Sequence, residues 1–159
     1  MLSGYTFHQK IKSFSLTEDF IVIGGNFKFL AITYDKERHD YPLEDKGIVS
    51  SIDNNRKNLF FIGFDNGFIL ILKIFYNKFI RVEEKAFFNN FNKAINCLSY
   101  HPFLNSFYTA SHIDNNIKMW SVKGTFIILL SHKYPCHTKI LKINHRTNEM
   151  YSALISGEI

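Results

Sequence analysis

The side chains of this chain that could bind a metal ion gather in its last third. Three histidines and one cysteine lie there within a short stretch: His132, Cys136, His137 and His145. Their spacing, H-x3-C-H-x7-H, matches no standard zinc pattern, in which the ligands come as close pairs at fixed separations. Three of the four also fall in predicted loops and turns, so we expect no bound metal.

Sequence signatures of catalysis or nucleotide binding are absent from the chain. It contains no G-x-S-x-G nucleophile motif, no glycine-rich phosphate loop ending in Lys-Ser or Lys-Thr, and no H-E-x-x-H motif. Gly24 and Gly25 are followed by NFKFLAITY, which has the pattern of a strand, whereas a phosphate-binding glycine loop opens a helix. We therefore expect a protein that is not an enzyme and binds no cofactor.

Charge and composition narrow the class of partner. The 159 residues carry a formal charge of +5, and lysines make up fifteen of the 19 basic residues. These lysines form no dense basic patch interleaved with aromatic residues, so direct nucleic-acid binding is not expected. Cys97 and Cys136 form no C-x-x-C pair, which favours a reducing intracellular compartment. The longest apolar runs, 68–72 and 126–130, are far shorter than the roughly 20 residues that cross a bilayer.

The segment 94–120, AINCLSYHPFLNSFYTASHIDNNIKMW, has the pattern of three short strands joined by tight turns. Its first strand ends at His101-Pro102, and a polar turn that contains Asp114 separates the second strand from the third. The third strand ends at Trp120, the only tryptophan, six residues after Asp114. An aspartate at this distance before a tryptophan is typical of one blade of a WD40 β-propeller.

Weaker copies of this unit recur at intervals of about 40 to 50 residues, as propeller blades do. In the best copy, 48–74, the turn Asp65-Asn66-Gly67 is a strong hairpin signal. The predicted blades are 11–46, 47–85, 94–132 and an incomplete one over 137–159. We therefore predict an all-β fold, a partial WD40 propeller of about three and a half four-stranded blades.

Three and a half blades do not close a ring, because propellers have about four to eight whole blades. We therefore expect a portion of a longer propeller, and, as the alternative, a chain that completes the ring by association. In both cases an isolated arc leaves apolar blade faces and strand edges open, which predicts marginal solubility.

A buried polar network is expected to fix the geometry of each blade. In a WD40 blade the turn aspartate accepts hydrogen bonds from a loop histidine, and a strand hydroxyl links that histidine to the tryptophan. In the third blade the hydroxyl is that of Ser111 or that of Thr109, and the loop histidine is missing. The residues assigned to this structural motif along the chain are Asp65, Asp114, Trp120, Ser111 and His137.

The loops at the mouth of the propeller channel are the expected binding surface, because specificity in such scaffolds lies in their loops. The candidate binding residues are Phe14, Ile48, Asn92 and Tyr134. Aromatic side chains at a channel mouth can hold a methylated lysine through cation–π attraction. The alternative is that these side chains only fill contacts between blades.

Two stretches also carry a narrower resemblance. NKAINCLSYHP followed by IKMW, and KYPCHTKILKINHRTNEMYSALISGEI, resemble successive blades of the ESC/EED family, the WD40 subunits of Polycomb repressive complex 2. In the second stretch Cys136-His137 stands where the family has Gly-His. DFIVIGGNFKFLAITY and NLFFIGFDNGFILILKI fall in the order of the family's early blades, so the resemblance covers nearly the whole chain and about half of a family member.

This resemblance implies a non-catalytic scaffold in a nuclear histone H3 lysine methyltransferase complex. The implied partners are a SET-domain methyltransferase subunit and the histone H3 tail, whose trimethylated lysine the family holds in an aromatic cage. By position, the first cage aromatic falls between Phe7 and Phe14, and the second falls near Ile48, which is not aromatic. The alternative function is a WD40 interaction module in another nuclear or cytoplasmic assembly.

Overall fold

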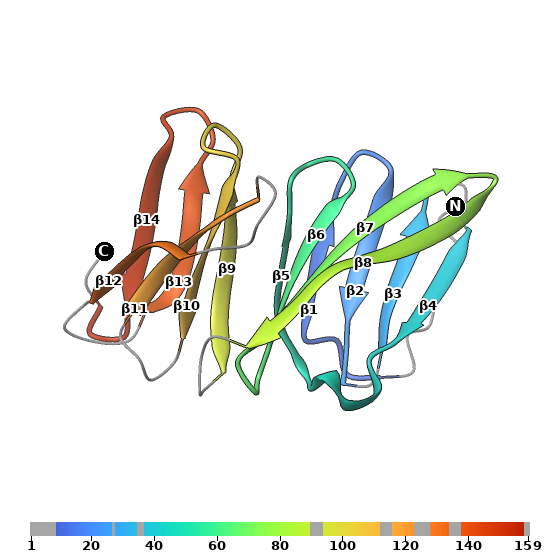
Figure 1. The fold of residues 1–159 in the computed structure, drawn as a ribbon, viewed down its shortest axis with the longest axis horizontal. Coiled ribbons are helices and arrows are strands. Elements are labelled where there is room, and N and C mark those ends of the chain that lie inside the picture. Colours follow the sequence, from blue (N-terminus) through green and yellow to red (C-terminus); the bar gives the residue numbers. More distant parts are fainter. Residues whose placement is uncertain are drawn as a thin grey trace.

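The computed structural model describes residues 9–26, 28–34, 37–89, 94–111, 116–122, 128–133 and 138–157 of the chain. These residues form fourteen β-strands and one short 3-10 helix, η1 (Glu44–Lys46). The strands make four antiparallel sheets that follow one another along the chain and stand side by side (Figure 1). No helix in these residues is long and apolar enough to cross a membrane.

The first sheet has the order β1-β2-β3-β4. Its strands are β1 (Ser13–Leu16), β2 (Phe20–Gly24), β3 (Lys28–Thr33) and β4 (Arg38–Pro42). Burial alternates along β2, as expected for a strand whose successive side chains point to opposite faces. The outer strand, β4, begins with charged residues that pair on the surface: Asp40 contacts Lys28 at 2.7 Å and Arg38 at 3.0 Å.

The second sheet has the order β5-β6-β7-β8 and the longest strands. They are β5 (Val49–Asn54), β6 (Leu59–Phe64), β7 (Phe68–Asn77) and β8 (Phe79–Asn89). The outer strand β8 continues to Asn89, because β7 is long enough to pair with it along its whole length. The charged residues in the first half and middle of β8 do not end the strand, since an edge strand tolerates charges.

The third sheet is complete, and the fourth has two strands in the described part of the chain. The third contains β9 (Ile95–His101), β10 (Ser106–Ser111), β11 (Asn116–Ser121) and β12 (Ile128–Lys133). The fourth contains β13 (Thr138–Asn144) and β14 (Glu149–Leu154). With three four-stranded sheets and a two-stranded one, the chain has the predicted all-β fold of a partial β-propeller.

Three apolar layers hold the four sheets together, one between each pair of neighbours. The middle sheets present large apolar side chains on both faces: in β6, Phe60 belongs to the first layer and Phe61 to the second. Both side chains are completely buried. Burial of such a side chain contributes about 1.5–3 kcal/mol, so these layers are the main source of stability. Representative members are Val22, Val49 and Leu72 in the first layer, Phe61, Ile95 and Trp120 in the second, and Tyr108, Leu141 and Ile143 in the third.

Two glycines allow the first strand of the following sheet to come close. A Cβ atom on Gly24 would lie 2.5 Å from Val49 Cγ1, and one on Gly63 would lie 2.8 Å from Ile95 Cγ2. Val49 and Ile95 begin β5 and β9, so both glycines touch the start of the next sheet. A larger side chain at either position would push the two sheets apart.

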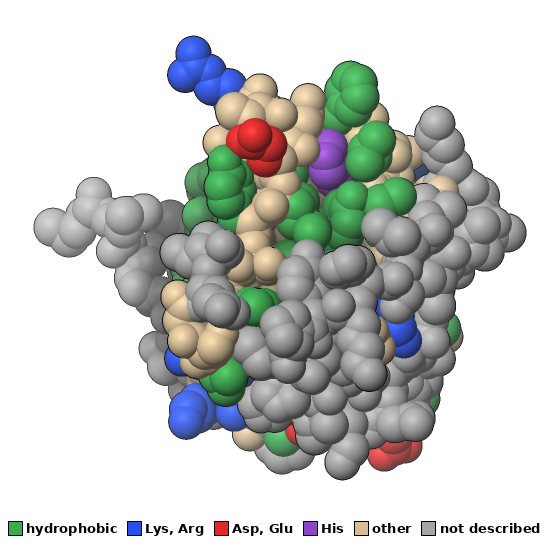
Figure 2. Space-filling view, turned by 90° about the vertical axis from the view of Figure 1, so that its left-hand side faces the viewer, with side chains coloured by type: hydrophobic (Ala, Val, Ile, Leu, Met, Phe, Trp, Pro, Cys, Tyr) green, Lys and Arg blue, Asp and Glu red, His purple; other side chains and the backbone are tan. Residues whose placement is uncertain are grey.

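Several of the exposed large apolar side chains lie on the first and last sheets. Phe14 is 61% and Leu16 53% exposed in β1, while Ile140 in β13 is 51% and Tyr151 in β14 is 47% exposed. Figure 2 looks onto the end of the arc where the last sheets lie and shows hydrophobic side chains gathered in its upper part. This exposure agrees with the expectation of open apolar blade faces.

The side chain of Trp120 lies within the second layer and is anchored by one hydrogen bond. Its Nε1 donates to Thr109 Oγ1 at 2.8 Å. Ser111, assigned to the structural motif from sequence, is not the partner. Phe107 lies opposite Trp120 in the strand pairing. Thr109 is two residues from Phe107 on the same face, about 7 Å along β10, whereas Ser111 is four residues from Phe107, about 13 Å away. Asp114 and His137 lie outside the described residues.

Thr109→Val keeps the shape of the side chain but removes the acceptor for Trp120. It is expected to lower the free energy of unfolding by about 1–3 kcal/mol, because a buried indole N–H would lose its partner. The matched control is Ser111→Ala, since the buried Ser111 hydroxyl has no hydrogen-bond partner among the described residues. Urea denaturation of both variants tests this, and equal losses would show that the hydrogen bond is not what matters.

Candidate binding surface at the channel mouth

The first strand of each sheet lies along the inner side of the arc. Neighbouring members of this set, β1 with β5, β5 with β9 and β9 with β13, are in contact. Each of these strands is followed by a tight turn, and the four turns lie at the same end of the arc, at the top in Figure 1. They cover residues 17–19, 55–58, 102–105 and 145–148. We call this end of the arc the channel mouth.

A cavity of about 360 Å³ opens at this mouth between three sheets. Its apolar wall is provided by Phe14 and Leu16 of β1, both more than half exposed. The arc curves enough for β13, in the last sheet, to line the same cavity as β1, in the first. The lining residues are Phe14, Ser15 and Leu16 from β1, Ile52, Asp53 and Asn54 from β5, Arg56 from the turn after β5, Lys142 from β13, and His145 just after β13.

Asp53 carries the acidic group of the cavity and also links two sheets. Its Oδ2 accepts the backbone N–H of Tyr100, in β9, at 2.8 Å. Burial raises the pKa of the Asp53 carboxyl above its usual range, although this hydrogen bond and nearby Lys142 act in the opposite direction. The carboxyl is therefore held in place by the fold, and its ionised form is costly there.

Arg56 and Lys142 provide the positive charge of the cavity. Burial, and after it the charge of Arg56, lowers the pKa of His145, so its imidazole is neutral at pH 7. Arg56 has a left-handed backbone conformation (φ 63°), and its backbone N–H donates to Asn54 Oδ1. Asn54 in turn donates to Ser15 Oγ at 2.6 Å and so ties this turn to β1. The cavity therefore offers two cations beside two exposed apolar side chains.

A buried histidine, His101, joins two of the turns at the mouth. The backbone N–H of Leu104 donates to His101 Nδ1 at 3.4 Å, and His101 Nε2 lies 3.2 Å from the carbonyl oxygen of Asn148. These two contacts fit the neutral tautomer with the proton on Nε2. The imidazole thus fastens the turn after β9 to the turn after β13.

The structure does not bring Ile48 to this surface. Ile48 precedes β5 at the opposite end of the arc. Phe14 is level with Asp53, and Asp53 lies about 17 Å from Ile48 along β5. The Ile48 N–H donates to Asp65 Oδ1 at 3.0 Å, and the Asp65 N–H donates to the Ile48 carbonyl at 2.9 Å. A backbone donor thus occupies the place expected for a loop histidine. Asn92 and Tyr134 lie outside the described residues.

Sequence reasoning found one residue of this cavity, Phe14, and missed the charged ones. Asp53, Arg56 and Lys142 fall near the ends of predicted first strands, which was the only local signal for them. Among the candidate metal ligands, His145 lines the cavity, while Cys136 and His137 lie outside the described residues. The described residues contain no group of three or more His, Cys, Asp or Glu side chains that could hold a metal ion.

Comparison with known proteins supports the fold. No family model matches the sequence, and no curated protein matches it. A chain in the crystal structure of the mitotic checkpoint complex is similar with a TM-score of 0.74 and 10% identity, over 91% of this chain and 44% of that chain. The computationally designed Ika4 protein is similar with a TM-score of 0.77 and 17% identity, over 98% of this chain and 92% of that one.

These likenesses show a β-propeller-like fold. The present chain spans less than half of the chain from the mitotic checkpoint complex. Neither likeness concerns the ESC/EED family, so membership of that family stays a prediction from the sequence.

Asp53→Asn tests how the buried carboxyl affects stability. Because the folded protein binds this proton more tightly than the unfolded chain, the free energy of unfolding falls as pH rises above about 4 through the raised pKa. Asparagine keeps an acceptor for Tyr100 without the charge, so the variant should exceed the parent in stability at pH 7 and match it near pH 4. Urea denaturation across this range, with exposed Asp19→Asn as control, measures the effect. A variant that is less stable than the parent only at pH 7 would show that attraction to Lys142 outweighs burial.

Gly47→Ala tests the turn that holds Ile48. Gly47 has φ 106°, and a Cβ atom there would lie 2.6 Å from the side-chain nitrogen of Asn66. The variant is expected to lose about 1–3 kcal/mol of unfolding free energy, from backbone strain together with the displaced side chain. Gly157→Ala, at φ 93° with open space around it, is the control for backbone strain alone. Thermal unfolding should show the larger loss in Gly47→Ala.

Proposed function

We propose that this chain is a non-catalytic scaffold that binds a protein partner at the channel mouth. The observation that carries this proposal is the cavity in which exposed Phe14 and Leu16 lie beside Arg56 and Lys142. Aromatic and arginine side chains are enriched in protein interfaces, and apolar anchors with a charged rim are their usual composition.

The way the cavity is built supports binding rather than catalysis. Most of its side chains project from inner strands that are packed into the apolar layers, so they form a surface that is already in place before a partner arrives. Asp53, the acidic group that a reaction would use as a base, is engaged with the Tyr100 backbone between two sheets. This contact gives the carboxyl a structural task.

The finer part of the proposal concerns the assembly. We infer an ESC/EED-like subunit of a Polycomb-type histone H3 lysine methyltransferase complex in the nucleus, with a SET-domain subunit and the histone H3 tail as partners. The sequence resemblance of 92–120 and 133–159 supports this inference. The similar fold of a chain in the mitotic checkpoint complex, itself a protein complex, supports a protein partner in general. A WD40 interaction module in another nuclear or cytoplasmic assembly is the second candidate.

Affinity purification of the tagged chain from its own cells tests both levels of the proposal. The expected result is recovery of a SET-domain protein and histones, together with nuclear localisation. Phe14→Asp should abolish this recovery, because it places a charge on the apolar wall of the cavity. Phe79→Asp is the matched control, since Phe79 is 76% exposed at the tip of the outer β7–β8 hairpin and does not line the cavity.

The possible outcomes separate the two levels. Partners without a SET-domain protein or histones, or exclusion of the chain from the nucleus, would contradict the Polycomb assignment and favour the second candidate. Partner loss of the same size in Phe79→Asp and Phe14→Asp would contradict binding at the channel mouth.

A further inference from the structure

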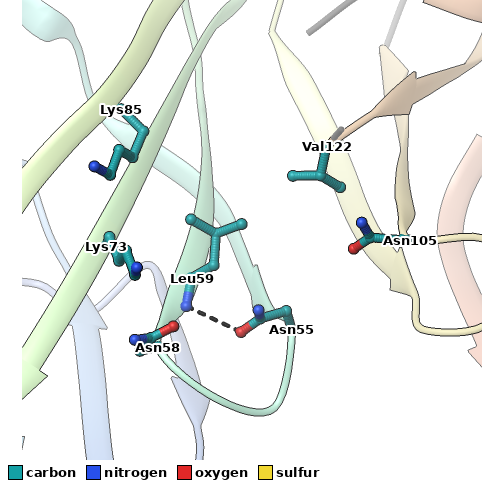
Figure 3. Close-up of a pocket in the computed structure, with 7 residues that line it drawn as sticks. All are labelled: Asn55, Asn58, Leu59, Lys73, Lys85, Asn105 and Val122. Carbon is teal, nitrogen blue, oxygen red and sulfur yellow. Dashed lines mark hydrogen bonds between the residues drawn. The ribbon is translucent and has the colours of Figure 1, made fainter. Parts of the chain in front are cut away.

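A second hollow lies between the second and third sheets, at the same end of the arc but separate from the cavity that Phe14 and Leu16 line. It has a volume of about 440 Å³, and Figure 3 shows the side chains around it. One side is formed by the second sheet and the other by the turn after β9 and the end of β11. We call this hollow the lysine groove. Its lining residues are Asn55, Asn58, Leu59, Lys73, Lys85, Asn105 and Val122.

Positive charge dominates the groove. Lys73 of β7 and Lys85 of β8 both line it. The register of β8 shifts at this point: Ile71 pairs with Ala86 and Leu72 with Glu84, so Lys85 is the extra residue of a β-bulge. Bulges redirect a side chain out of the regular alternation. The bulge therefore gives the groove a second ammonium group beside Lys73.

Among the described residues, one carboxylate forms an ion pair with an ammonium group of the groove. Glu83 contacts Lys85 at 2.6 Å and lies opposite Lys73 in the strand pairing. Its hydrogen bond with Lys85 holds the pKa of Glu83 below its usual range, with Arg81 and Lys73 contributing. Glu83 thus stays ionised, and the groove keeps a net positive charge that a ligand carboxylate can use.

The remaining walls offer amide donors and aliphatic surface. Asn105 Oδ1 accepts a hydrogen bond from the Tyr100 hydroxyl at 2.9 Å. The side-chain nitrogen of Asn105 is then left to donate to a ligand. Leu59 and Val122 face each other from the two sides in Figure 3, and both are half-buried. A ligand that satisfies all these groups carries carboxylates spaced around an apolar side chain.

We propose that the lysine groove binds an acidic extended segment of a protein partner, with carboxylates at Lys73 and Lys85 and an apolar side chain between Leu59 and Val122. This deepens the proposed scaffold function and rests on it. A nucleic acid fits less well, because Glu83 lies among the cations and would repel a continuous phosphate backbone. The aliphatic walls also lack an aromatic platform on which bases stack.

Fluorescence anisotropy with defined peptides tests this inference on the 159-residue chain. The probe is a short fluorescein-labelled peptide in which glutamates alternate with leucines, and the comparison peptide has lysines in place of the glutamates. We expect the acidic peptide alone to bind, and its affinity to fall as salt is added, because exposed charges are screened. Tighter binding of a labelled single-stranded RNA, lost in the same groove variants, would overturn the proposal.

Charge variants locate the site. Lys73→Glu and Lys85→Glu should each weaken binding of the acidic peptide by about tenfold, whereas Glu83→Gln should tighten it, because Lys85 loses its competing carboxylate. Lys139→Glu is the matched control, with the same change in net charge at an exposed position of β13, and should leave the affinity unchanged. An equal loss in Lys139→Glu, or weaker binding in Glu83→Gln, would contradict a site in the groove.

Two further measurements keep this test independent of folding and of the scaffold proposal. Thermal unfolding of each variant checks its fold, and Lys85→Gln replaces any lysine variant that fails to fold, with a smaller loss of affinity expected. Phe14→Asp should keep its affinity for the acidic peptide. If Phe14→Asp abolishes partner recovery while the groove variants bind the peptide normally, the scaffold proposal stands and the groove inference is wrong.

Discussion

Both faces of a middle sheet in this chain are apolar, and such a sheet has to cover each face with another sheet. The second sheet shows this most clearly, because Leu70 and Leu72 of β7 enter one apolar layer while Ile69 and Ile71 enter the next. With no α-helix in the described residues to cover a face, sheet-on-sheet packing is the remaining way to remove these side chains from water. The arrangement of every other element follows from this stacking.

Apolar packing alone does not fix how far one sheet slides along its neighbour, and polar contacts across the layers supply that register. Asn54 bonds to Ser15 Oγ between the first two sheets, and Asp53 bonds to the Tyr100 backbone between the next two. His101 joins the turns of the third and fourth sheets. These contacts cluster toward the inner strands, so the part of the molecule that forms the cavity is also the part held most specifically.

The strands were predictable because their signals are local. Alternating apolar residues and turns such as Asp65-Asn66-Gly67 mark strand and hairpin within a few residues, and the sheets follow in chain order. The cavity was not predictable in the same way, since Asp53 and Lys142 come together only through the curvature of the whole arc. The choice of Thr109 over Ser111 as the tryptophan's partner likewise needed the strand register, and the β-bulge at Lys85 left no mark in the sequence pattern.

Gly24 and Gly63 place almost no volume against the first residue of the next inner strand, while farther out the same layers are filled by phenylalanine, leucine and isoleucine. Each of these two layers is therefore a wedge, thin near the axis and thick toward the rim. The angle between neighbouring sheets is then a matter of side-chain volume distributed along the radius. This geometry produces the curvature that brings β13 into the same cavity as β1. The absence of a methyl group at Gly24 and Gly63 sets this curvature as much as any contact that the chain makes.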